Sequence, residues 1–140
     1  MARSAGYSGT PLSKKLGIID DGNVIALGAP PAILDLLEPL PEGVRLRTTL
    51  RSRTRADVIV AFVTERSALD DLVTRAGPVV FPAGGLWICW PKRTSGVTTD
   101  ITEDVLRDVI LPTGLVDNKV CAIDATWSAL RFVWRKELRV

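Results

Sequence analysis

Residues 56–63, Ala-Asp-Val-Ile-Val-Ala-Phe-Val, form the clearest strand pattern in the chain. The run is apolar, rich in β-branched residues and of strand length, as expected for a strand buried on both faces of a sheet. Thr64 is a suitable cap for the helix pattern that follows, in which apolar residues recur at helical spacing over 68–76. We expect Gly77-Pro78 to end that helix. A buried strand followed by an amphipathic helix is the unit from which parallel sheets are built.

The same alternation of strands and helices continues in both directions from this unit. Before it, we expect a short helix after Thr10-Pro11, a strand at 23–27, a helix opened by Gly28-Ala29-Pro30-Pro31, and a short edge strand within 44–50. After it, we expect a strand at 86–90, a helix capped by Thr99 or Asp100, and a hairpin of strands 119–123 and 129–134. The sequence therefore predicts an α/β fold: a Rossmann-like open, mostly parallel sheet with helices on both faces and a C-terminal antiparallel hairpin.

The composition indicates a single globular α/β domain over residues 1–140. Hydrophobic residues make up 46% and charged residues 24% of the 140 residues, which is the usual balance for a chain that buries a core. Residues 1–9 and 136–140 are expected to be flexible. No apolar run approaches the roughly 20 residues that cross a bilayer, and the N-terminus lacks the apolar core of a signal peptide. We therefore expect a cytoplasmic protein without a membrane contact.

The chain has no His and only two Cys residues, which excludes several mechanisms. Without His, neither a Ser-His-Asp nor a Cys-His mechanism of nucleophilic catalysis is available. Cys89 and Cys121 alone cannot complete a zinc site, so we expect no metal. Both cysteines lie in apolar segments and are expected to be reduced and buried, and the sequence does not say whether they are neighbours.

In open α/β sheets, ligands bind at the carboxyl ends of the strands, so the loops at those ends are the ones to inspect. The first, Gly28-Ala29-Pro30-Pro31, has one glycine followed by two prolines, which have no N–H group to offer a phosphate. It suits neither a dinucleotide nor the Gly-rich loop of a methyltransferase. A Walker A sequence is also absent, and we expect no cofactor.

Polar side chains stand at both ends of the strand within 114–128. Asp117, Asn118 and Lys119 precede this strand, whereas Asp124 and Thr126 follow it and so lie at its carboxyl end. Lys92 follows another strand, so Lys92 and Asp124 can face one crevice and exchange a proton. The ligand-binding candidates are therefore Trp90, Lys92, Asp100, Asp124, Thr126 and Trp127. Purely structural roles stay open, because Asp124 and Thr126 suit an Asx turn, Asp100 suits a helix cap, and tryptophans commonly pack in cores.

Basic residues are concentrated in two segments. Arginines stand at positions 45, 47, 51, 53 and 55, and the C-terminal segment carries Arg131, Arg135, Lys136 and Arg139. They form either a solvated face or a docking surface for an acidic partner or a phosphate-bearing ligand, with Arg47, Arg51, Arg53 and Arg55 as the docking candidates. Nucleic acid is the less favoured partner, because the net charge is only +2 and no aromatic residues alternate with these arginines.

Several motifs resemble those of one protein family. These are the opening Gly-Tyr-Ser-Gly-Thr-Pro-Leu at 6–12, Trp-Ile-Cys-Trp-Pro-Lys at 87–92, and Gly-Leu-Val-Asp-Asn-Lys-Val-Cys at 114–121 followed by Trp-Ser-Ala-Leu-Arg-Phe at 127–132. Together they resemble a family of small bacterial proteins catalogued only as a domain of unknown function. The chain departs from that pattern at residues 19–22 and at 28–31, the second of which is the first strand-end loop. The resemblance implies a single cytoplasmic domain and assigns no catalytic residue.

Three functions follow from these observations. The favoured interpretation is a non-catalytic binding or interaction module for an unknown protein or small-molecule ligand, because no complete catalytic constellation is visible. The first alternative is a transferase-like enzyme that acts on a small ligand through Lys92 and Asp124. The second alternative is docking of an acidic partner or nucleic acid through the arginines of 45–55. The sequence predicts no oligomeric state.

Overall fold

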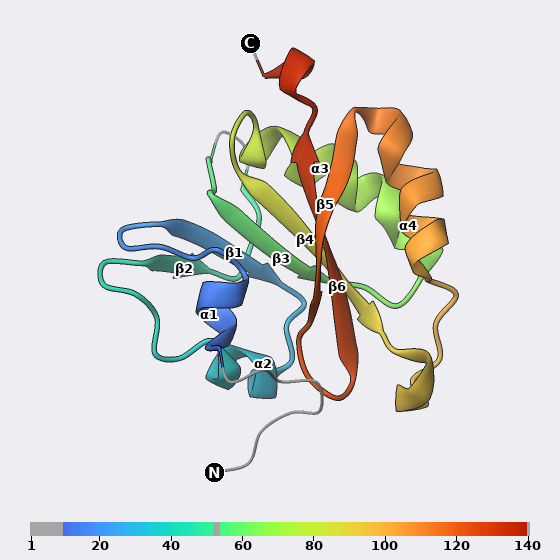
Figure 1. Ribbon diagram of the computed structural model, residues 1–140, viewed down its shortest axis with the longest axis horizontal. Helices are drawn as coiled ribbons and strands as arrows, with labels where there is room; N and C mark the ends of the chain where they lie inside the picture. The colour runs from blue at the N-terminus through green and yellow to red at the C-terminus, as the bar shows by residue number, and fades with distance from the viewer. Residues whose placement is uncertain (1–9, 52–53, 140) are drawn as a thin grey trace.

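The computed structural model describes residues 10–51 and 54–139, which form one six-stranded sheet in the order β2-β1-β3-β4-β6-β5 (Figure 1). The strands are β1 (Asn23–Leu27), β2 (Arg45–Arg47), β3 (Val58–Phe62), β4 (Gly85–Pro91), β5 (Leu115–Ala122) and β6 (Trp127–Trp134). β1 to β4 are parallel, and β6 is antiparallel to both of its neighbours, β4 and β5. The predicted Rossmann-like α/β fold with a C-terminal hairpin is confirmed. The hairpin inserts its second strand into the sheet, so β5 is one edge strand and β2 is the other.

Helices cover both faces of the sheet, as expected. They are α1 (Leu12–Lys15), α2 (Pro31–Leu36), α3 (Leu69–Val80) and α4 (Glu103–Ile110), with short 3₁₀ turns η1 (Arg66–Ala68), η2 (Arg93–Ser95), η3 (Leu111–Thr113) and η4 (Lys136–Leu138). α1 and α2 pack on one face, and α3 and α4 pack on the other (Figure 1). Residues 136–138 of the expected flexible tail form the turn η4. Residues 1–9 and 140 lie outside the described part of the chain.

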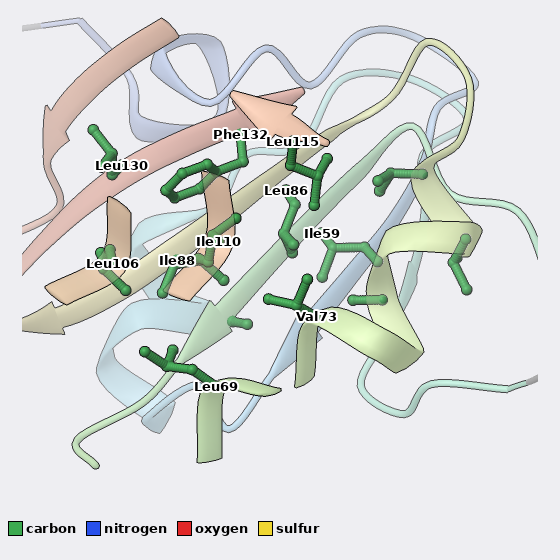
Figure 2. Packing of buried hydrophobic residues seen from close by; sticks show 14 of the residues in the cluster. Ile59, Leu69, Val73, Leu86, Ile88, Leu106, Ile110, Leu115, Leu130 and Phe132 are labelled. Atoms are coloured by element: carbon green, nitrogen blue, oxygen red, sulfur yellow. The ribbon is translucent and has the colours of Figure 1, made fainter. Parts of the chain in front are cut away.

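Alternate residues of the central strands divide the core into two clusters, one on each face. On β4, Leu86, Ile88 and Trp90 face α3 and α4, whereas Trp87 and Cys89 face α1 and α2. Figure 2 shows the first cluster, in which Ile59, Leu86, Ile88 and Phe132 of the sheet meet Leu69, Val73, Leu106 and Ile110 of the two helices. The strands are therefore buried on both faces, which explains why their sequences read as continuous apolar runs.

Three helix boundaries differ from those expected. α3 continues through Gly77-Pro78 to Val80, because Val79 and Val80 are buried against the sheet and a proline removes only one helical hydrogen bond. Thr64 does not cap that helix, which begins only after the 3₁₀ turn η1. Thr102 caps α4 in place of Thr99 or Asp100, and its Oγ1 accepts a hydrogen bond from the Val105 amide at 3.2 Å.

The two cysteines are free and lie on different strands. Cys89 of β4 and Cys121 of β5 both pair with Ala129 of β6, which runs between them. Two strand spacings separate their backbones by roughly 10 Å, which is too far for a disulfide. The question that the sequence left open is therefore answered: the two residues share a face of the sheet without being adjacent.

None of the helices within residues 10–51 and 54–139 combines the length and the apolar character that crossing a membrane requires.

Candidate functional site

The strand order of the sheet reverses between β1 and β3. From β1 the chain moves to β2 on one side, whereas from β3 it moves to β4 on the other side. In doubly wound folds, the crevice outside the carboxyl ends of two such strands is the usual place for a ligand. A cavity of about 430 Å³ lies there, and we call it the switch-point cavity. Its lining consists of Leu27, Gly28, Thr48, Thr49, Leu50, Ala61, Phe62, Val63, Ala68, Asp71, Leu72 and Arg75.

Gly28 shapes the floor of this cavity, where the chain leaves β1. Its φ angle is 66°, a conformation that suits glycine, and a Cβ atom at this position would lie 3.2 Å from the carbonyl oxygen of Phe62. The next turn of chain enters α2 at Pro31, and the amides of Ile33 and Leu34 already donate to the carbonyl of Pro30 at 2.9 and 3.3 Å. This loop therefore holds few free amides that could bind a phosphate.

The walls of the switch-point cavity are mainly apolar. The large apolar residues of the lining are Leu27, Leu50, Phe62, Val63 and Leu72, and its polar residues include two threonines, Thr48 and Thr49. At the rim, an Asp71 Oδ2 lies 3.7 Å from Nη1 of Arg75, and both side chains are exposed. An apolar cavity of this volume with few polar groups is typical of small-molecule sites.

A second cavity, of about 520 Å³, lies at the carboxyl end of β4, and we call it the β4-end cavity. It is lined by Trp90, Pro91, Arg93, Gly96, Val97, Thr98, Thr99, Ile101, Thr102 and Glu103. Two hydrogen bonds attach this loop to the segment between β3 and α3: Thr99 Oγ1 donates to the Thr64 carbonyl at 2.6 Å, and the Arg66 amide donates to Asp100 Oδ1 at 2.7 Å. Since Val63 and Ala68 line the switch-point cavity, residues 63–68 connect the two linings.

The sequence-predicted ligand candidates are divided between two places. Trp90 is a buried wall of the β4-end cavity, and Asp100 holds the loop beside it. The other four, Lys92, Asp124, Thr126 and Trp127, gather where β4 ends beside the tip of the β5–β6 hairpin.

The hairpin tip is held mainly by backbone contacts. Asp124 Oδ1 accepts the amides of Thr126 and Trp127, both at 2.8 Å, which is the expected Asx turn. The Lys92 amide donates to the Thr126 carbonyl at 2.7 Å. The Trp127 ring packs edge-on against Phe62, with 5.0 Å between ring centroids. Lys92 and Asp124 thus lie beside the carboxyl end of β4 and the tip of the hairpin, outside the linings of the two cavities above. Proton transfer between them stays a prediction.

Most residues of the switch-point cavity, including Thr48, Leu50, Phe62 and Leu72, were not predicted from the sequence. Thr48 and Leu50 follow β2, Phe62 ends β3 and Leu72 lies on α3, and only the strand order shows that these segments converge. Of the docking candidates, Arg47 and Arg51 are exposed on or after β2, and Arg55 lines a different cavity. Arg53 lies outside the described residues.

The two thiols are poor nucleophiles. Burial raises the pKa of Cys89 well above the usual value for a thiol, and the nearby Cys121 and Asp124 raise it further. Burial also raises the pKa of Cys121, against the opposing effect of Lys15, Lys119 and Lys92. Because the thiolate is the reactive form, neither residue is activated at neutral pH. Among the described residues, no three His, Cys, Asp or Glu side chains come together as metal ligands.

No family model matches the chain, and no curated protein is similar to it in sequence. Solved structures with a similar fold include a SAM dependent methyltransferase from Aquifex aeolicus, with a TM-score of 0.61, 12% identity and coverage of 86% of each chain. They also include a DhpI–SAH complex (0.63, 10% identity, 90% of this chain and 83% of that one). A third is a ribosomal protein L11 methylase from Lactobacillus delbrueckii subsp. bulgaricus (0.58, 11%, 89% and 75%). At these identities, the likeness establishes the fold.

These neighbours contradict the favoured interpretation of a non-catalytic binding or interaction module. The fold of this chain is similar to that of proteins named as a methyltransferase and a methylase, which favours the alternative of a small-ligand enzyme. The non-catalytic interpretation was wrong because the absence of a complete set of catalytic side chains does not exclude an enzyme. Group transfer can instead draw much of its rate from binding and orienting the reactants, and such residues leave no compact motif.

Proposed function

We propose that the protein is a small-ligand enzyme of the transferase type that binds its ligand in the switch-point cavity. The observation that carries this proposal is the position of an apolar cavity of about 430 Å³ at the carboxyl ends of β1 and β3, where the strand order reverses. The similarity of the fold to methyltransferases supports the same conclusion.

The names of these neighbours imply S-adenosylmethionine, and the lining can be compared with its parts. An adenine ring is planar and largely apolar on its faces, and Leu50, Phe62 and Leu72 suit it. In dinucleotide folds, an acidic residue about 20 positions after the first glycine binds the ribose hydroxyl, and here Thr48 stands at that spacing from Gly28. Asp71 is the one carboxylate in the described lining, and it faces Arg75. These residues fit a planar ring but not the ribose of this cofactor.

The described residues indicate how the cavity would hold its ligand. Phe62 and the leucines exclude water from an apolar ring, and the hydroxyls of Thr48 and Thr49 offer both donors and acceptors. A transferase must also hold an acceptor close to its donor. The β4-end cavity supports such a role, because residues 63–68 contact both linings.

A cavity-filling variant tests the location of the ligand. Ala68 is exposed at the rim of the switch-point cavity, so Ala68→Trp fills the space without entering the core. Ser67→Trp is the matched control, because Ser67 is exposed in the same turn and lies outside the lining. The measurement is a thermal-shift panel of adenosine, S-adenosylmethionine, S-adenosylhomocysteine and other small ring-bearing metabolites.

We expect at least one panel member to stabilise the wild type and Ser67→Trp, by about 2.7 kcal/mol at a hundred times its dissociation constant. Ala68→Trp should show no shift with the same compound. A ligand that shifts all three proteins equally would place binding elsewhere, and a panel without any shift would count against the proposal.

The predicted proton-transfer pair can be tested once a ligand that turns over is known. Lys92→Met should lower kcat by about 10²- to 10⁴-fold, the usual contribution of a general acid or base, while the thermal shift by the ligand persists. Lys119→Met is the control, because Lys119 is an exposed lysine in the middle of β5. Equal kcat values for Lys92→Met and the wild type would remove Lys92 from the mechanism.

A further inference from the structure

A third cavity lies at the opposite end of the strands, beside the residues with which β3 and β4 begin. It has a volume of about 350 Å³, and we call it the arginine cavity. It is lined by Gly17, Ile19, Arg55, Ala56, Asp57, Val58, Val80, Phe81, Pro82, Ala83, Gly84 and Arg131. Because the switch-point and β4-end cavities stand at the carboxyl ends of the strands, this cavity is separate from both.

Arg131 reaches the cavity from β6 across a glycine of β4. A Cβ atom on Gly85 would lie 2.5 Å from Nε and 2.9 Å from Cζ of Arg131, so the guanidinium occupies the space that a side chain at position 85 would need. Arg131 pairs with Trp87 in the sheet and lies on the face that α1 and α2 cover in part. The glycine therefore gives the guanidinium its place at the sheet surface.

The charge of Arg131 is not compensated within residues 10–51 and 54–139. Its guanidinium donates one hydrogen bond, from Nη1 to Asn118 Oδ1 at 3.4 Å, and forms no ion pair in that part of the chain. A guanidinium has five N–H donors, so most of them stay available. Burial lowers the pKa of Arg131, and the positive charge of Arg139 lowers it further. The nearby carboxylate of Asp57 already accepts the Asn23 amide at 2.8 Å.

Arg107 provides a comparison, because its positive charge is compensated by carboxylates of the same protein. Its guanidinium meets three carboxylates, with N–O distances of 3.3 Å to Glu103, 3.6 Å to Asp104 and 3.2 Å to Asp117. The hydrogen bond to Asp117 is the main cause that raises the pKa of Arg107. Arg131 has the opposite environment, although both arginines are partly buried. Arginine is common where carboxylates or phosphates are bound by paired hydrogen bonds, so the uncompensated guanidinium of Arg131 is a candidate for binding an anion.

The arginine cavity also unites the two basic segments of the sequence. Arg55 comes from the segment of 45–55, and Arg131 comes from the C-terminal segment, 76 positions later, yet both line one cavity. Ile19 adds an apolar wall and is 68% exposed. The concave shape and the volume suit a small molecule better than the flat surface of a protein partner.

We propose that the arginine cavity binds the phosphate or carboxylate group of a small anionic ligand, held by the guanidinium of Arg131 with Arg55 on the same lining. The planar fork of an arginine matches two oxygens of either group. The proposal does not depend on the function of the switch-point cavity, because one site lies at the carboxyl ends of the parallel strands and the other at their amino ends.

Isothermal titration of the full chain with two sets of anions tests this site. One arm uses inorganic phosphate and pyrophosphate, and the other uses succinate and citrate. The variant is Arg131→Met, and the matched control is Arg135→Met, which removes an exposed arginine of the same segment that lies outside this lining. Urea unfolding of each variant confirms that it is folded.

We expect one arm to bind the wild type and Arg135→Met, and to bind Arg131→Met about tenfold or more weakly, as for the loss of a hydrogen-bonded charge. Gly85→Ala provides a second variant, which keeps every arginine but displaces the guanidinium of Arg131. It should weaken the same anion. Equal binding to the wild type and Arg131→Met would overturn the proposal. So would an absence of binding by both arms at millimolar concentrations, or binding of polyglutamate alone, which would indicate a protein-docking surface.

Discussion

At the scale of single residues, two tryptophans tie the sheet to its helices through hydrogen bonds. The indole Nε1 of Trp87 donates to the Leu16 carbonyl at 3.0 Å, and that of Trp134 donates to the Gly77 carbonyl at 3.0 Å. Trp87 is fully buried, between β4 and the end of α1. Trp87 therefore packs in the core and Trp134 packs against it, and each also supplies a hydrogen bond to a carbonyl at the end of α1 or within α3. No described buried side chain has a nitrogen or oxygen without a hydrogen-bond partner.

Trp87→Phe should destabilise the protein at this point. The change leaves the Leu16 carbonyl without its donor, which costs about 1–3 kcal/mol, and it also leaves space where the larger ring was. Urea unfolding measures the difference. Trp127→Phe is the control, because Trp127 is half-buried and packs on Phe62, so its loss should be smaller. Equal stabilities of Trp87→Phe and the wild type would show that the hydrogen bond contributes nothing.

At the scale of elements, each of the six expected strands is present, but one was expected too short: β5 begins at Leu115, four residues before the expected strand at 119–123, so Asp117, Asn118 and Lys119 lie within it and not before it. The strand expected at 23–27 is β1 to the residue, because its apolar run stands between two turns. The ends of α3 and α4 were wrong because local cap and breaker residues were weighed without tertiary packing. Pro78 stays within α3 since the valines after it are buried, and Asp100 is used by the Arg66 amide instead of by α4.

The N-cap of α4 gives a direct test at this scale. Thr102→Ala removes the hydrogen bond from the Val105 amide to Thr102 Oγ1, and the loss of such a cap costs about 1 kcal/mol of stability. Thr98→Ala is the control, because Thr98 is an exposed residue of the same loop. Thermal unfolding should show a lower Tm for Thr102→Ala alone. If Thr102→Ala and Thr98→Ala have the same Tm, the N-cap hydrogen bond of α4 adds no stability.

At the scale of the whole molecule, the cavities depend on how distant segments converge. The switch-point cavity combines residues from the ends of β1 and β3, the segment after β2, and α3. Because ligands bind at strand ends, the loop at Gly28 could be predicted from the sequence as part of a site. Thr48 and Leu72 could be assigned to the same cavity only from the strand order. Arg55 was a candidate from its charge alone, and its place beside Arg131 follows only from the packing of β3 near β6 through β4.

The position of β6 has a consequence for the synthesis of the chain. β5 meets the rest of the sheet only through β6, and β6 is the last strand in chain order, placed between two strands made before it. A nascent chain that has reached only Ala122 therefore has no partner for β5 and leaves the open side of β4 unpaired. The sheet is complete only after residues 127–134 have been made, so β5 can join the sheet only after elongation through Trp134, whereas β4 can already pair with β3.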